Sequence, residues 1–202
     1  MRAVPLENLP LNVLLIVVST TRARLFKEGL GPAKITQTTS SNPADLSKTI
    51  AQLKPDVIIM DCENPDITII NNLKTATADN PTPIVMFVEG RDGSLAKEAV
   101  RSGISAYIVD GLLSGRVQPV VEIAIERFNI LKNLHSELEK SKENLEARKV
   151  IERAKGLLME KQGISESEAF ISMRKLAMTE SITIKDVADK ILSVASILGD
   201  NF

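Results

Sequence analysis

The sequence predicts an α/β domain built on a doubly wound, five-stranded parallel sheet, followed by a coiled-coil helix and an all-α bundle of three helices. Three observations lead to this order. Short apolar runs rich in β-branched residues alternate with helix-like segments in the first part of the chain, a heptad pattern follows, and capped amphipathic segments come last. We therefore expect three domains, at residues 1–117, 118–145 and 146–202.

The predicted strands are short apolar runs, as expected for parallel strands that are buried on both faces. They lie at residues 13–18, 56–60, 84–88 and 106–109, and a further weak strand at residues 35–39 completes the set of five. Helices are predicted at residues 22–29, 43–53, 67–78 and 94–103, and from residue 118 onward. Gly, Pro and Asn residues separate these segments. Repeated β–α units favour a parallel sheet whose functional loops follow the carboxyl ends of the strands.

Residues 121–145 form an a/d heptad seam, in which the positions step alternately by three and four residues. Polar His135 and Lys142 interrupt the seam at two a positions, and the outer face carries charges of both signs. One alternative is a helix that packs on its own domain. Because the seam contains no Gly or Pro after Pro119, we favour self-association as a parallel homodimer. The seam residues are Val121, Ala124, Phe128, Leu131, His135, Leu138, Lys142 and Leu145.

The last segment predicts three short helices. Beyond Leu145 the apolar positions change phase to a wider stripe that suits a bundle core, and Gly163 is predicted to end that helix. Ser165 and Glu168 form a capping box for the second helix, and Thr183 with Asp186 forms a weaker cap for the third. The inner face of the second helix is predicted to hold Ala169, Phe170, Met173, Leu176 and Ala177.

The composition excludes several classes of function. A net charge of −1 provides no global basic field, and 3% aromatic residues with no Trp argue against a base-stacking platform on a sheet or barrel. The single cysteine, Cys62, excludes an internal disulfide and a multi-cysteine metal site and is typical of the reducing cytosol. We expect a cytoplasmic protein with no metal, cofactor or membrane span.

No set of catalytic residues emerges from the sequence. The sole histidine, His135, lies on the heptad seam, and the chain contains neither a G-x-x-x-x-G-K-[ST] loop nor an H-E-x-x-H motif. We therefore expect that this chain is not an enzyme.

A local basic surface is predicted at the start of the last domain. Arg148, Lys149, Arg153 and Lys155 stand against one acid, Glu152. Arg174 and Lys175 would extend this surface if the second helix packs close by. Four basic residues on a helix are by themselves usually a solvated face. Gly156 in mid-helix costs about 1 kcal/mol relative to Ala, which a close approach by RNA or by another helix would explain.

Residues 148–159 resemble the ANTAR domain, together with residues 165–170 and 174–178. The most specific part is Ala154-Lys155-Gly156. ANTAR domains are three-helix RNA binders that act as antiterminators on stem-loops of leader transcripts. The resemblance therefore implies RNA binding, with contacts from Arg148, Lys149, Arg153, Lys155, Gly156, Arg174 and Lys175.

The first domain resembles a response-regulator receiver, which has a flavodoxin-like fold. A receiver, a coiled coil and an ANTAR domain together are typical of the AmiR and NasT family. Residues 83–87 and 105–112 are most similar to the nitrate and nitrite assimilation branch. The resemblance implies control by a sensor protein similar to periplasmic binding proteins (NasS-like or AmiC-like), which holds the regulator until a small ligand releases it.

The receiver resemblance is incomplete at the residues that handle phosphate. Receivers hold Mg²⁺ with acids after the first strand, accept phosphate on an Asp after the third, sense it with a hydroxyl after the fourth and neutralise it with a Lys after the fifth. Here Ser19 and Thr20 replace the acids, Val88 the hydroxyl and Asp110 the Lys.

Asp61 alone of these features is present, so we interpret it as an inactive phosphoacceptor position, a solvated carboxylate at the end of a strand. Two alternatives stay open: a phosphorylation-activated two-component response regulator, and a structural dimerisation module that binds no nucleic acid.

Overall fold

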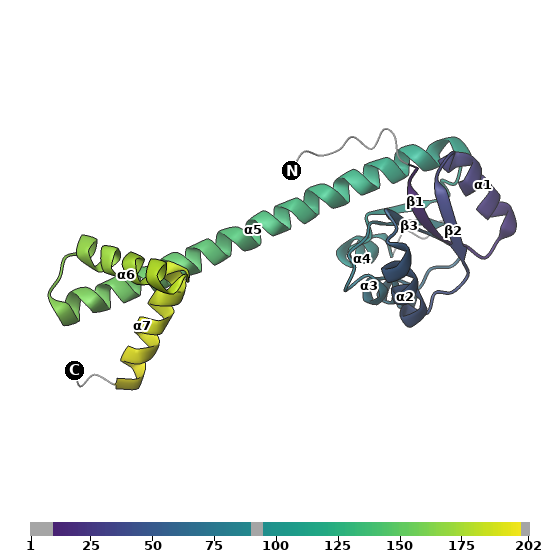
Figure 1. The fold of residues 1–202 in the computed structure, drawn as a ribbon. Helices are drawn as coiled ribbons and strands as arrows, with labels where there is room; N and C mark the ends of the chain where they lie inside the picture. Colours follow the sequence, from purple (N-terminus) through teal and green to yellow (C-terminus); the bar gives the residue numbers. More distant parts are fainter. Residues whose placement is uncertain (1–9, 90–94, 199–202) are drawn as a thin grey trace. The chain divides into compact units, whose positions relative to one another are not determined.

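The computed structural model describes residues 10–89 and 95–198 of the chain (Figure 1). It divides into two compact units, Met1–Lys132 and Asn133–Phe202. One helix, α5 (Ser114–Gln162), begins in the first unit and continues without a break into the second. Both predicted domain boundaries, after residues 117 and 145, therefore fall inside a single helix.

The first unit is the predicted five-stranded parallel sheet. Its strand order is β2-β1-β3-β4-β5, the flavodoxin-like order of a doubly wound fold. The helices alternate with the strands along the chain, as the β–α pattern indicates. The elements are β1 (Asn12–Ile16), α1 (Thr20–Leu30), β2 (Lys34–Thr38), α2 (Pro43–Leu53), β3 (Val57–Cys62), α3 (Ile67–Ala76), β4 (Ile84–Val88), α4 (Ala96–Arg101) and β5 (Ala106–Val109).

Most element boundaries agree with the sequence prediction to within two residues. The largest difference is the start of α5, which begins four residues before the predicted residue 118. Residue 94, the predicted start of the fourth helix, lies outside the described residues.

Helices cover both faces of the sheet and bury the central strands β1, β3 and β4, whereas the edge strands β2 and β5 are only partly buried. On one face, α1 and the start of α5 pack through Phe26, Val117, Val121 and Ala124. On the other face α2, α3 and α4 pack against a second apolar cluster. Gly29 of α1 shows how closely the first layer is packed, because a β-carbon there would lie 2.4 Å from the carbonyl oxygen of Ser114.

The strand register brings the polar residues of the sheet to its carboxyl edge. Asp61 pairs with Phe87, and Val88 pairs with Val109 on the next strand. Glu89 and Asp110 come directly after β4 and β5. Acidic residues from three neighbouring strands therefore meet at one edge of the sheet.

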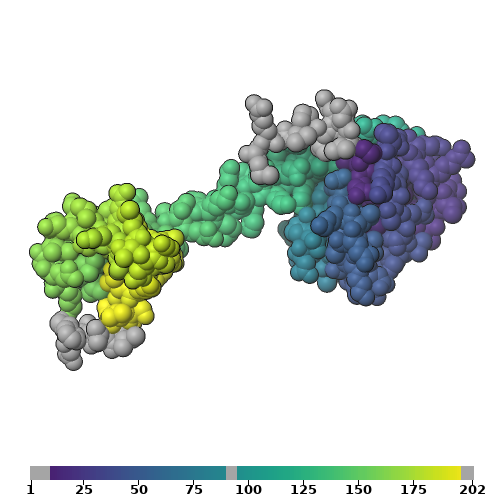
Figure 2. Space-filling model, in the orientation of Figure 1, coloured from purple at the N-terminus to yellow at the C-terminus, as the bar shows by residue number. Residues whose placement is uncertain are grey.

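The heptad seam divides into a buried and an exposed part. Val121 and Ala124 belong to the core of the first unit, as the alternative of packing on the same domain predicts. Leu131, Leu138 and Leu145 are each more than half exposed. All residues from 129 to 146 are exposed, and no other described segment covers this stretch on the face seen in Figure 2. The outer half of the seam is thus an apolar stripe that no other described residue of the chain covers.

The second unit contains the end of α5 with α6 (Glu166–Glu180) and α7 (Ile184–Leu198). Gly163 ends α5 with a φ of 68°, a left-handed conformation that glycine adopts without strain. The predicted capping box is formed: Ser165 N–H donates to Glu168 at 2.9 Å, and Glu168 N–H donates to the Ser165 hydroxyl at 3.3 Å. Thr183 and Asp186 form the same reciprocal pair, with N–H donors at 3.0 and 3.1 Å.

Each cap stabilises the ionised form of its acid. The hydrogen bonds from Ser165 lower the pKa of Glu168, and those from Thr183 lower the pKa of Asp186. Both helix starts are therefore best capped when the acids are ionised, because a protonated carboxyl is a weaker acceptor.

The core of the second unit is narrower than the sequence predicts. Ala154, Met173, Ala177, Val187 and Ala188 are buried. The predicted core positions Phe170 and Leu176 are instead 39% and 41% exposed, so that prediction was wrong. On α6 the buried residues Ala169, Met173 and Ala177 form one line along the helix that faces the core of the second unit. Phe170 and Leu176 lie on opposite sides of this line and are therefore only partly covered.

No helix of the described residues is long and apolar enough to cross a membrane.

Candidate functional site

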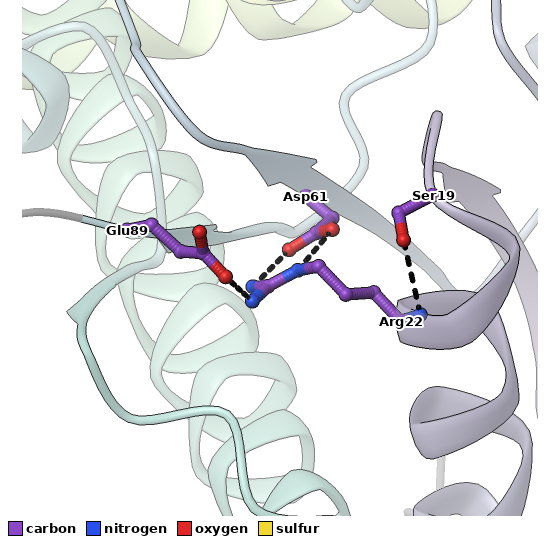
Figure 3. A network of polar contacts seen from close by, with 4 residues as sticks. All are labelled: Ser19, Arg22, Asp61 and Glu89. Atoms are coloured by element: carbon purple, nitrogen blue, oxygen red, sulfur yellow. Dashed lines mark hydrogen bonds and ion pairs between the residues drawn. The ribbon is translucent and has the colours of Figure 1, made fainter.

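The carboxyl edge of the sheet holds an ion-paired cluster centred on Arg22 (Figure 3). Its guanidinium donates to both oxygens of Asp61, from Nε to Oδ2 at 2.7 Å and from Nη2 to Oδ1 at 2.5 Å. Nη1 of Arg22 pairs with the carboxylate of Glu89. Two parallel hydrogen bonds between a guanidinium and a carboxylate form the strongest geometry for such a pair.

Local structure places Arg22 for this contact. The hydroxyl of Ser19 caps α1 and accepts the N–H of Arg22 at 3.4 Å, which sets the first turn of the helix beside the sheet edge. The side chains of Arg22 and Asp61 are 16% and 5% exposed. The hydrogen bond to Asp61 raises the pKa of Arg22, and burial opposes that shift.

This geometry corrects the interpretation of Asp61 as a solvated carboxylate at a strand end. Asp61 is the penultimate residue of β3, is buried and has a bidentate arginine partner. The sequence reasoning also missed Arg22, because the pair joins residues 39 positions apart. The sequence did contain a signal for such a residue. Asp61, Glu89 and Asp110 follow or end three neighbouring strands, and no lysine follows the fifth strand, so a basic residue from another element is expected near these acids.

The remaining receiver positions lie where the sequence places them. Val88 is buried at the end of β4, and Asp110 follows β5, where its N–H donates to the Val88 carbonyl oxygen at 3.0 Å. Arg22, Glu89 and Asp110 line a pocket of about 390 Å³ at this edge. Among the residues that the structure describes, no group of three His, Cys, Asp or Glu side chains could hold a metal ion.

Cys62, next to Asp61, is half-buried. Desolvation is the main cause that raises the pKa of its thiol, and the Asp61 charge adds to it. A raised thiol pKa reduces the thiolate fraction, so Cys62 is a poor nucleophile.

The second candidate site is the basic surface of the second unit. Arg148, Lys149, Arg153, Arg174 and Lys175 are exposed. Lys149 pairs with Glu146 at 2.7 Å in an exposed ion pair. Within residues 10–89 and 95–198, the other four residues of this set make no ion pair. Their charges are available to an external anion.

Lys155 differs from the other predicted contact residues. Its side chain is 9% exposed, and its Nζ lies 2.9 Å from Glu152 and 2.6 Å from Glu166. The hydrogen bond to Glu166 is the main cause that raises the pKa of Lys155 and also lowers the pKa of Glu166. The ammonium thus joins α5 to the first turn of α6, and its low exposure leaves little of it for a direct contact to RNA.

Gly156 has open space beside it. A β-carbon at this position would meet no atom within 4 Å, so no described helix of the chain explains the glycine. Of the two explanations from the sequence, approach by another helix of this chain is excluded for the described residues. Approach by RNA stays a prediction.

Comparisons with known proteins agree with this two-unit architecture. Residues 139–192 match the ANTAR domain, a region that begins seven residues before the predicted start of the last domain and ends before residue 202. The transcriptional regulatory protein PdtaR of Mycobacterium tuberculosis is 34% identical over 139 residues, which cover 69% of this chain and 68% of that protein.

Two further matches are partial. The nitrate regulatory protein of Klebsiella oxytoca is 37% identical over 67 residues, 33% of this chain and 17% of that protein. The crystal structure of NtrX from Brucella abortus in complex with ATP matches with a TM-score of 0.52 at 19% identity, and covers 73% of this chain and 35% of that one. This last match shows the fold alone.

A receiver-like α/β fold followed by an ANTAR domain defines a class of transcriptional regulators. The chain belongs to this family of ANTAR-containing response regulators, together with PdtaR.

The Arg22 cluster predicts a large stability difference between two arginines of the same helix. Arg22→Ala leaves the buried Asp61 carboxylate without its counter-charge and should cost about 3 kcal/mol of unfolding free energy. Arg24→Ala removes an exposed pair with Glu28 and should cost less than about 0.5 kcal/mol. Hydrogen exchange of the β1 and β3 amides measures both effects within the first unit. Equal effects for the two variants would mean that the Arg22 cluster is not a stabilising contact.

Proposed function

We propose that this chain is an RNA-binding transcription antitermination regulator that acts on stem-loops of leader transcripts. The ANTAR match over residues 139–192 carries this proposal. The electrostatics of the second unit support it, because Arg148, Arg153 and Arg174 are exposed cations without acidic partners among the described residues. Such cations release counterions on binding a phosphate backbone, which favours association.

The chain acts by binding and not by catalysis. The buried titratable groups that the structure describes are engaged with each other: Asp61 with Arg22, and Lys155 with Glu152 and Glu166. A general base or nucleophile needs a free lone pair within reach of a substrate. These ion pairs support a role in holding the fold.

We propose control by a protein partner and not by phosphorylation, because the carboxylate of Asp61 is already paired within the chain. Both of its carboxylate oxygens already accept hydrogen bonds from Arg22. A phosphoryl group on Asp61 would have to displace Arg22, whose guanidinium also pairs with Glu89 and lines a pocket together with Glu89 and Asp110. The rival function, a phosphorylation-driven response regulator, requires the hydroxyl and the cation that Val88 and Asp110 replace.

The partner in this proposal is a sensor protein similar to periplasmic binding proteins, which sequesters the regulator in the cytoplasm until it binds a small ligand. The match to the nitrate regulatory protein of Klebsiella oxytoca supports genes of nitrate and nitrite assimilation as targets. That match covers 33% of this chain, and the resemblance of residues 83–87 and 105–112 to the nitrate and nitrite assimilation branch adds to it.

We expect the exposed arginines that have no acidic partner among the described residues to contribute most to the affinity for RNA. The probe is a pool of RNA hairpins with one stem and a randomised loop, from which the full chain selects its tightest member. Arg148→Ala and Arg153→Ala should each weaken binding and flatten the log–log salt dependence by about 0.7 to 0.9 per lost phosphate contact. Lys190→Ala is the matched control, because its ammonium is already paired with Glu180 at 2.5 Å.

Two outcomes of this titration contradict the proposal in different ways. If the chain selects no hairpin above a blunt duplex of the same stem, it does not recognise RNA loops. If the two arginine variants bind as tightly as the Lys190→Ala control, the exposed arginines are a solvated face and do not contact RNA.

The exposed half of the heptad seam supports a parallel homodimer. Leu131 and Leu138 present an apolar stripe on a helix that nothing in the described chain covers, and burial against a second copy would remove this stripe from water. Leu131→Glu with Leu138→Glu should therefore convert the dimer to a monomer in sedimentation at micromolar concentration.

The control places two glutamates on the outer face of the same helix. Asn133→Glu with Lys140→Glu lies two residues from each seam leucine, at exposed positions, and should leave the dimer intact. A wild-type chain that sediments as a monomer, or a control that dissociates equally, would show that the seam is not the dimer contact.

A further inference from the structure

Phe170 differs from every other described aromatic residue in its exposure. Phe26 and Phe87 are buried and pack edge to face, with ring centroids 5.1 Å apart. Tyr107 and Phe128 are half-buried. Phe170 is 39% exposed, more than any other aromatic residue that the structure describes. The core of the second unit does not explain this ring, because Met173 and its alanine neighbours form the inner line of α6.

Charged residues lie one helical turn on either side of Phe170. Arg174 follows it by four residues, so the two side chains share a face of α6. Arg174 is exposed and has no acidic partner among residues 10–89 and 95–198. On the other side, Glu166 precedes Phe170 by four residues, and Lys155 binds this acid at 2.6 Å. The one carboxylate beside the ring on this face is therefore neutralised from within the fold.

An exposed ring beside an unpaired guanidinium fits the chemistry of an unpaired nucleotide. Bases splayed from an RNA loop stack on aromatic side chains, and arginine binds the neighbouring phosphate. Stacking tolerates any base, because every base has a flat π-face. The composition argued against a stacking platform on a sheet or barrel, but a single ring on a helix needs no such platform.

We propose that Phe170 and Arg174 form a contact for an unpaired nucleotide, in which the ring stacks on the base and the guanidinium binds the phosphate. Lys155 is a positioning residue in this contact: it holds the first turn of α6 and offsets the charge of Glu166 close to the ring. The inference rests on the proposed function, because it names the part of the RNA that this site binds.

Leu176 provides a matched control on the same helix. Its exposure of 41% is close to that of Phe170, and it lies on the opposite flank of the Met173 line. No cation is three or four residues away from Leu176 along α6, and the acid four residues after it, Glu180, is paired with Lys190. Leu176 thus matches the apolar exposure of Phe170 but lacks both its ring and its arginine neighbour.

The test uses the full chain and the hairpin that the wild type selects from the randomised-loop pool. Phe170→Leu keeps an apolar side chain but removes the ring, and should weaken binding about 5- to 100-fold with no change in the salt slope. Phe170→Tyr keeps the ring and should bind within about twofold of the wild type. Arg174→Ala should weaken binding and flatten the salt slope by about 0.7, the value for one phosphate contact on a single strand.

Leu176→Ala should bind as the wild type does, and circular dichroism with sedimentation confirms that each variant keeps its helices and its oligomeric state. The inference is overturned if Phe170→Leu binds the hairpin as tightly as Phe170→Tyr. It is also overturned if Phe170→Leu changes the oligomeric state, because the ring then lies at a protein contact. If the wild-type chain selects no hairpin, the proposed function itself is wrong. If the wild type selects a hairpin but the Phe170 variants bind it equally well, only the contact at Phe170 is wrong.

Discussion

The structure depends on α5, a single helix whose two ends belong to two different cores. Val117, Val121 and Ala124 close one face of the sheet, and Ala154 with Leu158 packs in the three-helix bundle. The sequence of this helix changes character accordingly. Its first turns and its last turns each bury apolar side chains within the chain, whereas Leu131, Leu138 and Leu145 in the middle remain exposed. A helix with an unpartnered apolar stripe of this kind is stabilised when it meets a second copy of itself.

Charge determines what the receiver-like site can do. Receivers use a metal ion and a lysine to bring a phosphoryl group to an acidic edge, and here the required positive charge comes from Arg22 on α1. Because the guanidinium is part of the chain, the charge of Asp61 is offset without an external cation. The same device occurs in the second unit, where Lys155 binds Glu152 and Glu166 within the fold. In both units a basic residue pairs with acids within the fold, Arg22 in the first and Lys155 in the second, while Arg148, Arg153 and Arg174 are exposed.

Periodicity in the sequence predicted the fold well, because the apolar spacing of strands and helices depends on local geometry. The helix at residues 43–53, the strands at 84–88 and 106–109 and both reciprocal caps were predicted correctly. Long-range contacts were missed. The Arg22–Asp61 pair joins distant residues, and Lys155 is buried by Glu166 from the next helix. Phe170 and Leu176 were assigned to the core because the spacing of apolar residues shows which face of α6 is buried, but not how wide the buried face is. The buried face of α6 is narrow, with the small residues Ala169 and Ala177 at its centre.

We propose that this regulator binds RNA without phosphoryl control at Asp61. One measurement tests it most directly: the affinity of the full chain for its selected hairpin, before and after incubation with acetyl phosphate and Mg²⁺, with the intact mass recorded in parallel. Because Arg22 occupies both oxygens of Asp61, the account predicts no stoichiometric adduct and no change in affinity. A stable adduct on Asp61 together with tighter RNA binding would contradict it.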